Sequence, residues 1–194
     1  MDQVWRWDSV NVCWAKYGYQ KPARSGTAAW RKWTGSAWQE LTDADVVRPG
    51  ETFLYFRGND AQGSFTLSGA VKEFSASPQY TINKGNYAFI ARPWPIGFKL
   101  SELNEIATWS ALATAPTFGG TMDQIWRWDS ANVCWAKYGY QKPARSGTAA
   151  WRKWTGSAWQ ELTDADAVAD NEGFLYFRGN DAQLTLTFKP LVTE

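Results

Sequence analysis

The chain has 194 residues, and its 20 lysines and arginines nearly balance its 19 aspartates and glutamates, giving a formal net charge of +1. This balance argues against nucleic-acid binding, which usually needs a one-sided basic surface. Histidine is absent, which removes the commonest general base and metal ligand, and with them the Ser/His, Cys/His and zinc classes of site.

The sequence contains a tandem duplication, because residues 1–62 recur almost unchanged at 122–183. The two stretches, called copy A and copy A′ below, differ at seven positions. Residues 63–121 are called segment B, and residues 184–194 are called the tail. Repetition of this kind predicts modules that bury their apolar faces on neighbouring modules. We therefore divide the chain into an aromatic β module (1–62), a linking segment with a hairpin and a short helix (63–121), and a second aromatic module with a C-terminal strand (122–194).

Copy A is predicted to consist of short β-strands, since runs rich in aromatic and β-branched residues alternate with turn-forming residues. The predicted strands are residues 3–7, 11–19, 27–33, 36–41 and 52–57, with a tight hairpin turn at 33–36. The last strand has apolar side chains on both faces, because Phe53 and Tyr55 oppose Leu54 and Phe56. We expect it at the centre of a sheet that is covered on both sides.

Segment B is predicted to continue with strands at 64–68, 71–74, 79–82 and 86–91, the last two joined by a hairpin turn at 83–86. Pro93 and Pro95 then end the strand pairing, because proline has no backbone N–H to donate. A short helix is expected from Ser101, as its N-cap, to about Thr108.

The tail has the alternating pattern of a strand over 184–190, and it follows Gln183 where the strand at 64–68 follows Gln62. We interpret it as the first strand of a second segment B that this sequence does not complete. On this interpretation copy A′ has a segment B before it and copy A has none. The predicted fold class is all-β, with antiparallel β-sandwich-like tandem modules and one short helix in the middle segment. The sequence has neither an apolar run that could span a membrane nor a secretion leader.

A loose family resemblance accompanies this pattern. The order of GNYAFIARPWP (85–95), a short helix, MDQIWRWD (122–129), an aromatic hairpin and GFLYFRG (173–179) resembles β-rich tandem-repeat modules of large secreted, mostly uncharacterised bacterial surface proteins. The resemblance covers about residues 64–189 and returns in copy A without its segment B. It implies an extracellular or cell-surface, non-catalytic setting, and it names no ligand and no functional residue.

The 14 tryptophans are the first candidates for a binding site, because exposed aromatic rings stack on the faces of sugars. Trp30 and Trp33, with their copies Trp151 and Trp154, adjoin cationic side chains, which favours a surface position. This predicts an aromatic platform on each copy. The alternative is that the rings fill a core or a protein interface, where each buries about 150–250 Å².

Acidic clusters raise two further hypotheses. Residues 42–45 and 57–60 offer oxygens for calcium, but they lack EF-hand spacing, and turn-forming Asp and Asn explain them without a metal. No cofactor is therefore expected. Glu40, Asp43 and Asp45 offer carboxylates for glycoside hydrolysis, which requires a facing pair across a cleft. Near-verbatim duplication of a catalytic unit argues against an enzyme.

The two cysteines, Cys13 and Cys134, occupy equivalent positions, one in each copy, so no disulfide forms inside a copy. Pairing between the copies or between chains stays open. A thiol between Val12 and Trp14 on a strand is, however, typical of a small buried apolar residue.

Together these features favour a non-catalytic extracellular structural subunit that assembles head to tail with copies of itself into a filament or surface layer. Leu184, Leu186 and Phe188 form the predicted self-assembly strand, which would complete copy A of the next chain by strand donation. The alternative is a bivalent carbohydrate-binding protein that uses the exposed tryptophans of both copies. The expected partners are thus other copies of the chain or a polysaccharide, without nucleic acid or a membrane span.

Overall fold

The chain folds into two compact units, unit 1 with Met1–Lys72 and unit 2 with Glu73–Glu194. Unit 2 joins copy A′ to the tail and to most of segment B. The paired strands are antiparallel, so the predicted all-β, sandwich-like fold class is confirmed. In the described part, no helix is long and apolar enough to cross a membrane. This computed structural model describes residues 1–8, 11, 13–21, 26–43, 45, 53–56, 58, 79–92, 96–129, 131–144, 146–170, 172–179 and 182–189.

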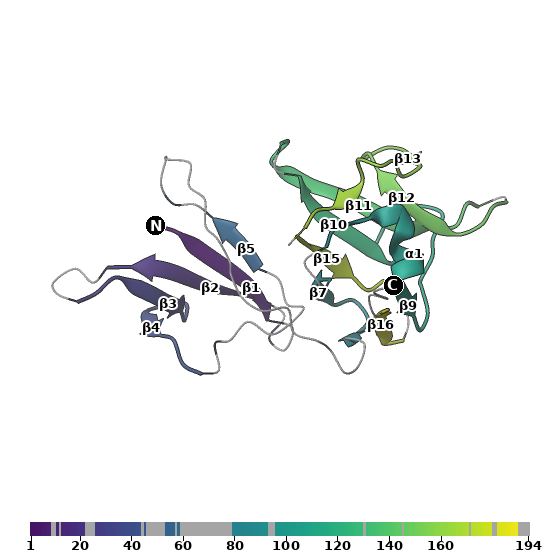
Figure 1. Cartoon of the computed structure of the whole chain (residues 1–194). Coiled ribbons are helices and arrows are strands. Elements are labelled where there is room, and N and C mark those ends of the chain that lie inside the picture. The colour runs from purple at the N-terminus through teal and green to yellow at the C-terminus, as the bar shows by residue number, and fades with distance from the viewer. Residues whose placement is uncertain are drawn as a thin grey trace, which may run out of the picture. The chain divides into compact units, whose positions relative to one another are not determined.

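Unit 1 contains a five-stranded sheet in the order β4-β3-β2-β1-β5 (Figure 1). The predicted turn after Trp33 is confirmed, since Trp33 lies opposite Trp38 and Gly35 adopts a φ of +98° that favours glycine. The strand predicted to be central, β5, lies at the edge and pairs with β1 alone among the described strands. The five strands are β1 (Gln3–Asp8), β2 (Cys13–Gln20), β3 (Ala29–Trp33), β4 (Trp38–Glu40) and β5 (Phe53–Phe56).

Unit 2 repeats this sheet and extends it by one strand from segment B. The six-stranded sheet has the order β13-β12-β11-β10-β15-β7. Strand β15 is the counterpart of β5. It pairs with β10 on one edge and with β7 on the other, so β15 has the central position that the sequence of copy A predicts for its last strand. The strands are β7 (Tyr87–Ala91), β10 (Gln124–Asp129), β11 (Cys134–Gln141), β12 (Ala150–Trp154), β13 (Trp159–Gln160) and β15 (Gly173–Phe177).

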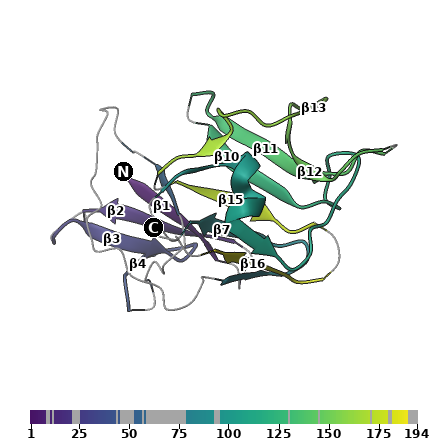
Figure 2. The ribbon, with the colours of Figure 1, turned by 45° about the vertical axis from the view of Figure 1, so that its right-hand side comes forward.

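A second layer covers one face of the large sheet in unit 2. It contains the three-stranded sheet β6-β16-β9 and a short helix that lies over the large sheet (Figure 2). Its elements are β6 (Gln79–Ile82), β8 (Phe98–Lys99), η1 (Leu100–Glu102), α1 (Leu103–Ile106), β9 (Ala107–Trp109), β14 (Ala167–Val168), which pairs with β8, and β16 (Leu184–Phe188). Both layers contribute to one core, formed by Ile82, Ile90, Phe98, Leu100, Leu103, Ala107, Ile125, Tyr138, Trp151, Val168, Phe174, Tyr176, Leu184, Leu186 and Phe188.

The short helix of segment B is confirmed, but its expected cap and end, and the expected hairpin before it, were wrong. The turn at 83–86 exists, with the Asn86 N–H donating to the Asn83 carbonyl at 3.1 Å, but it is not a hairpin. Strand β6 pairs with β16, and β7 pairs with β15, so the turn carries the chain from one layer to the other. The helix ends before Ala107, and the Glu102 carboxylate accepts the Lys99 N–H at 3.3 Å in place of a cap by Ser101. The predicted strands at 64–68 and 71–74 lie outside the described residues. The other two predicted strands of segment B, at 79–82 and 86–91, are confirmed as β6 and β7.

Much of the aromatic surplus lies on the other face of each sheet, which we call the outer face. In unit 1, Trp7 and Trp14 meet edge to face with ring centroids 5.4 Å apart, and the Lys16 ammonium lies 4.4 Å from the Trp5 ring. Copy A′ repeats both contacts, at 5.3 Å for Trp128 with Trp135 and 4.5 Å for Lys137 with Trp126. Such cross-strand aromatic pairs stabilise a sheet face without a second layer.

Candidate functional site

The strongest candidate site is the inner face of unit 1, which is the face whose counterpart in unit 2 packs on the second layer. In unit 2 this face is formed by Ile125, Tyr138, Trp151, Phe174 and Tyr176, of which Trp151 is 5% exposed and the others 0%. The corresponding residues of unit 1 are Val4, Tyr17, Trp30, Phe53 and Tyr55. Tyr17 is buried and the other four are half-buried. Because the side chains match at four of the five positions, the difference reflects what covers each face.

Segment B and the tail supply the cover in unit 2. Leu103 of α1 and Leu186 of β16 are both 0% exposed within its core. Full burial of one leucine side chain stabilises the folded state by about 1.5–3 kcal/mol relative to leaving it exposed. The described residues of unit 1 provide no equivalent second layer.

A cavity of about 220 Å³ lies on the inner face of unit 1. In unit 2 the positions that correspond to Val4, Tyr17, Trp30 and Phe53 belong to the hydrophobic core. The cavity therefore marks space that core side chains fill in the other unit. Its lining residues are Val4, Arg6, Tyr17, Trp30, Leu41, Asp45 and Phe53.

The edge of β5 adds a second open feature beside this face. In unit 2, β7 pairs along the whole of β15, with Phe89 opposite Leu175. No described strand occupies the matching edge of β5. A strand edge with free N–H and C=O groups favours pairing with a further strand. Among the described residues, the inner face and the β5 edge of unit 1 thus have no cover like that of the matching face and edge in unit 2.

An ion pair lies at one end of the inner face. Asp45 Oδ1 accepts hydrogen bonds from Lys32 Nζ at 2.8 Å and from the Tyr17 hydroxyl at 3.3 Å. Its Oδ2 accepts from the main-chain N–H and the hydroxyl of Thr42, each at 3.1 Å. The hydrogen bond from Lys32 lowers the pKa of Asp45 to about 2. Burial works to raise this pKa, whereas the hydrogen bonds from Thr42 lower it further. Both oxygens therefore have protein partners, which explains the 42–45 cluster as a structural feature.

Copy A′ repeats this ion pair in a more buried form. Asp166 Oδ1 accepts from Lys153 Nζ and from the Tyr138 hydroxyl, both at 3.0 Å. Burial works to raise the pKa of Asp166, but hydrogen bonds from Thr163 and Lys153 outweigh it, so the pKa is lowered. Burial also raises the pKa of Tyr138. The same contacts thus form in both copies, whether or not a second layer packs on the inner face.

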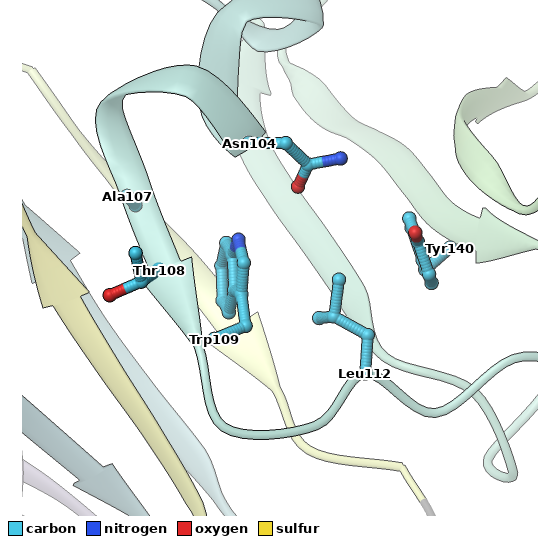
Figure 3. Close-up of a pocket in the computed structure, with 6 residues that line it drawn as sticks. All are labelled: Asn104, Ala107, Thr108, Trp109, Leu112 and Tyr140. Atoms are coloured by element: carbon cyan, nitrogen blue, oxygen red, sulfur yellow. The ribbon is translucent and has the colours of Figure 1, made fainter.

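A second candidate site is an open pocket of about 480 Å³ in unit 2. Figure 3 shows Trp109 and Tyr140 on either side of Leu112, with the Asn104 amide near them. Trp151 lies behind both rings, with centroid distances of 5.9 Å to Trp109 and 5.3 Å to Tyr140. The pocket is lined by Asn104, Ala107, Thr108, Trp109, Leu112 and Tyr140.

The surroundings of the four tryptophans predicted to form platforms differ between the copies, although Trp154 meets Trp159 at 5.1 Å much as Trp33 meets Trp38. Trp151 is 5% exposed and belongs to the core, whereas Trp30 is half-buried beside Tyr19. Trp154 stacks on Phe118 at 5.6 Å and 7°. Trp33 meets Trp38 at 5.2 Å. The two copies therefore do not present the same ring surface.

The predicted self-assembly strand is placed inside unit 2. Leu184, Leu186 and Phe188 are each 0% exposed. Strand β16 pairs with β6 on one side and β9 on the other. Within this chain the strand has no free edge and no exposed apolar face.

The predicted carboxylates are not brought together as a facing pair. Glu40 is exposed and lies 3.8 Å from Arg31, Asp43 is exposed, and Asp45 points into the inner face. Of the 57–60 cluster, only Gly58 is described. In the described ranges no group of three or more His, Cys, Asp and Glu side chains gathers as a metal site would require.

The expectation of buried thiols was wrong, because Cys13 and Cys134 are both exposed and free. Each is the first residue of its strand and lies opposite an aspartate, Asp8 or Asp129, at the turn end of the hairpin.

Sequence reasoning missed a buried ion pair and the pocket residues from segment B. Arg178 Nη1 lies 2.6 Å from Asp123 Oδ2, and the two side chains are 3% and 0% exposed. Asp123 also accepts the N–H of Ala113 at 2.7 Å, which ties the loop after β9 to the sheet. Segment B occurs once in the sequence, so no second copy draws attention to Asn104 or Trp109.

Comparisons with protein families, curated proteins and solved structures gave no match for this chain.

Proposed function

We propose that this protein is a non-catalytic structural subunit that associates with other copies of itself through the inner face of unit 1. The contrast between the two copies carries the proposal, because side chains that are buried in unit 2 lie half-buried in unit 1. A half-exposed apolar face beside a cavity, next to a strand edge that no described strand occupies, is typical of an association surface. An extracellular location belongs to the proposal and is supported by the sequence resemblance alone.

The partner that fits this face best is unit 1 of a second copy. Leu103 and Leu186, from segment B and the tail, are already fully buried in unit 2. Supplying either segment to another chain would empty one core to fill another, with no net gain in buried apolar area. The inner face of unit 1 in a second copy is only half-buried, so packing against it would bury additional apolar area. Two such sheets packed face to face would lie about 10 Å apart, as in other β-sandwiches.

This mode of association differs from donation of strand β16. Face-to-face packing of two identical surfaces is isologous, so by itself it gives a dimer. Growth into a filament or surface layer then requires a second, heterologous contact elsewhere on the molecule. The bivalent carbohydrate-binding alternative has less support, since Trp30 and Trp151 differ in exposure.

Sedimentation velocity of the full chain over a range of concentrations tests the proposal. Leu41 is 42% exposed and lines the cavity, so Leu41→Asp should leave the fold intact while placing a charge in the interface. We expect the wild type to dimerise with rising concentration and Leu41→Asp to remain monomeric, because burying an unpaired carboxylate is costly.

The matched control is Val133→Asp, an equally drastic change at a residue of unit 2 that is 73% exposed. Val133 has a φ of +52°, a conformation that Asp tolerates better than valine. This variant should dimerise like the wild type. A wild type that is monomeric at every concentration, or a Leu41→Asp variant that dimerises normally, would count against the proposal.

A further inference from the structure

The pocket in unit 2 has aromatic walls that are fixed from behind. One wall is Trp109, whose indole stacks on the fully buried Tyr176 with centroids 5.4 Å apart and planes at 24°. The other wall is Tyr140, which packs against Trp151 at 5.3 Å. Because both rings already lie against the core, a ligand would not have to order them, and this lowers the cost of binding.

The polar groups around the pocket are uncharged, and several lack partners. Within the described part of the chain, the Asn104 amide and the Tyr140 hydroxyl make no hydrogen bond. The indole N–H of Trp109 is buried without an acceptor. Polar groups that are buried without a partner are rare in native proteins. Here the Trp109 N–H is such a group, and it lies in the same lining as the exposed Asn104 amide and the half-buried Tyr140. Together these groups point to a ligand that brings hydrogen-bonding groups of its own.

We propose that this pocket binds the ring of a neutral sugar. A volume of about 480 Å³ falls within the range of small-molecule sites. A pyranose presents C–H groups on its faces and hydroxyls around its edge. The faces pack on Trp109 or Tyr140, and the hydroxyls exchange hydrogen bonds with the Asn104 amide. The lining contains no charged side chain, so an anionic sugar would lose hydration without gaining a counter-charge.

Copy A provides an internal comparison for this site. Tyr19 and Trp30 repeat the ring pair of Tyr140 and Trp151. The ring centroids of Tyr19 and Trp30 are 5.6 Å apart at an interplanar angle of 56°, and those of Tyr140 and Trp151 are 5.3 Å apart at 55°. Trp109, Asn104 and Leu112 come from segment B, however, and the described residues of unit 1 contain no counterpart to them. In the part of the chain that the structure describes, this site therefore occurs once, in unit 2, and it does not depend on self-association.

Affinity electrophoresis of the full chain in gels that contain neutral glucans, mannans or galactans tests the site, with a polyuronate gel for comparison. At least one neutral polysaccharide should retard the wild type. Tyr140→Ala should weaken binding about tenfold through loss of ring contact, and Asn104→Ala should weaken it several-fold. Asn104 is exposed, so this variant keeps the fold even if Tyr140→Ala does not.

Tyr19→Ala is the matched control, because it removes the equivalent tyrosine from unit 1, and it should bind like the wild type. Weaker binding in both Tyr140→Ala and Asn104→Ala, with Tyr19→Ala unchanged, supports the proposal. Absence of retardation in every neutral gel, retardation by the polyuronate alone, or any other pattern among the variants overturns it.

Discussion

Asp45 and Asp166 show how one residue behaves in two environments. Both accept hydrogen bonds from a lysine, a tyrosine and a threonine. The pKa of Asp45 lies at about 2, below the value of about 3.9 for an unfolded aspartate. The ionised form therefore stabilises the fold above about pH 4, and this contribution is lost as the pH falls through about 2.

Replacement of Asp45 with asparagine tests this linkage. Asp45→Asn should lower the free energy of unfolding by about 2 kcal/mol at neutral pH. The difference from wild type should narrow as the pH falls from about 4 to about 2, because a protonated aspartate resembles asparagine. Urea denaturation followed by tryptophan fluorescence measures it. Asp43→Asn, at an exposed position, is the control, and a deficit that is constant with pH would contradict the assignment.

At the scale of single residues, the sequence predicts chemical type better than environment. Trp30 and Trp151 have identical sequence neighbours, yet one is half-buried and the other is 5% exposed. Cys13 follows the pattern of a buried strand residue, but it is exposed at the turn end of its hairpin. Burial of these residues depends on segments that are distant in sequence, which local pattern does not report.

Strand β16 illustrates the same point at the scale of elements. Its alternation of Leu184, Leu186 and Phe188 with threonines predicts a strand with one apolar face, and this is confirmed. Which strands it pairs with depends on the edges that β6 and β9 offer. For the same reason the turn at 83–86 is found, while the pairing of its flanking strands is not predicted. Local turn chemistry specifies a reversal of direction but not the sheet that each strand joins.

Leu186→Ala distinguishes the pairing of β16 within one chain from strand donation between chains. Deleting this buried side chain should lower the stability of unit 2 by about 2–5 kcal/mol. The loss should be the same at every protein concentration, since the partners of β16 lie in its own chain. Thr187→Ala, which is half-buried on the other face of β16, should change stability by about 0.5 kcal/mol or less.

Thermal unfolding at several protein concentrations, followed by circular dichroism, measures both variants. A loss that disappears on dilution, together with weaker self-association, would instead indicate that β16 is exchanged between chains.

At the scale of the whole molecule, the duplication predicts that both copies form the same sheet, and this is confirmed by their matching registers. The two copies differ, however, in the cover of their inner faces. The consequence for exposure emerges only from the structure, because it depends on which face of the sheet segment B and β16 cover. We propose that the inner face of unit 1, over which the described residues place no second layer, is covered by a second copy.

Hydrogen exchange read by mass spectrometry tests this claim most directly, since the two copies yield distinguishable peptides. Val4 and Ile125 differ in mass, as do Thr52 and Gly173, so β1 is separated from β10 and β5 from β15. On dilution, the amides of β1 and β5 should exchange faster, whereas those of β10 and β15 should exchange at an unchanged rate. Exchange in β1 and β5 that does not depend on protein concentration would contradict the account.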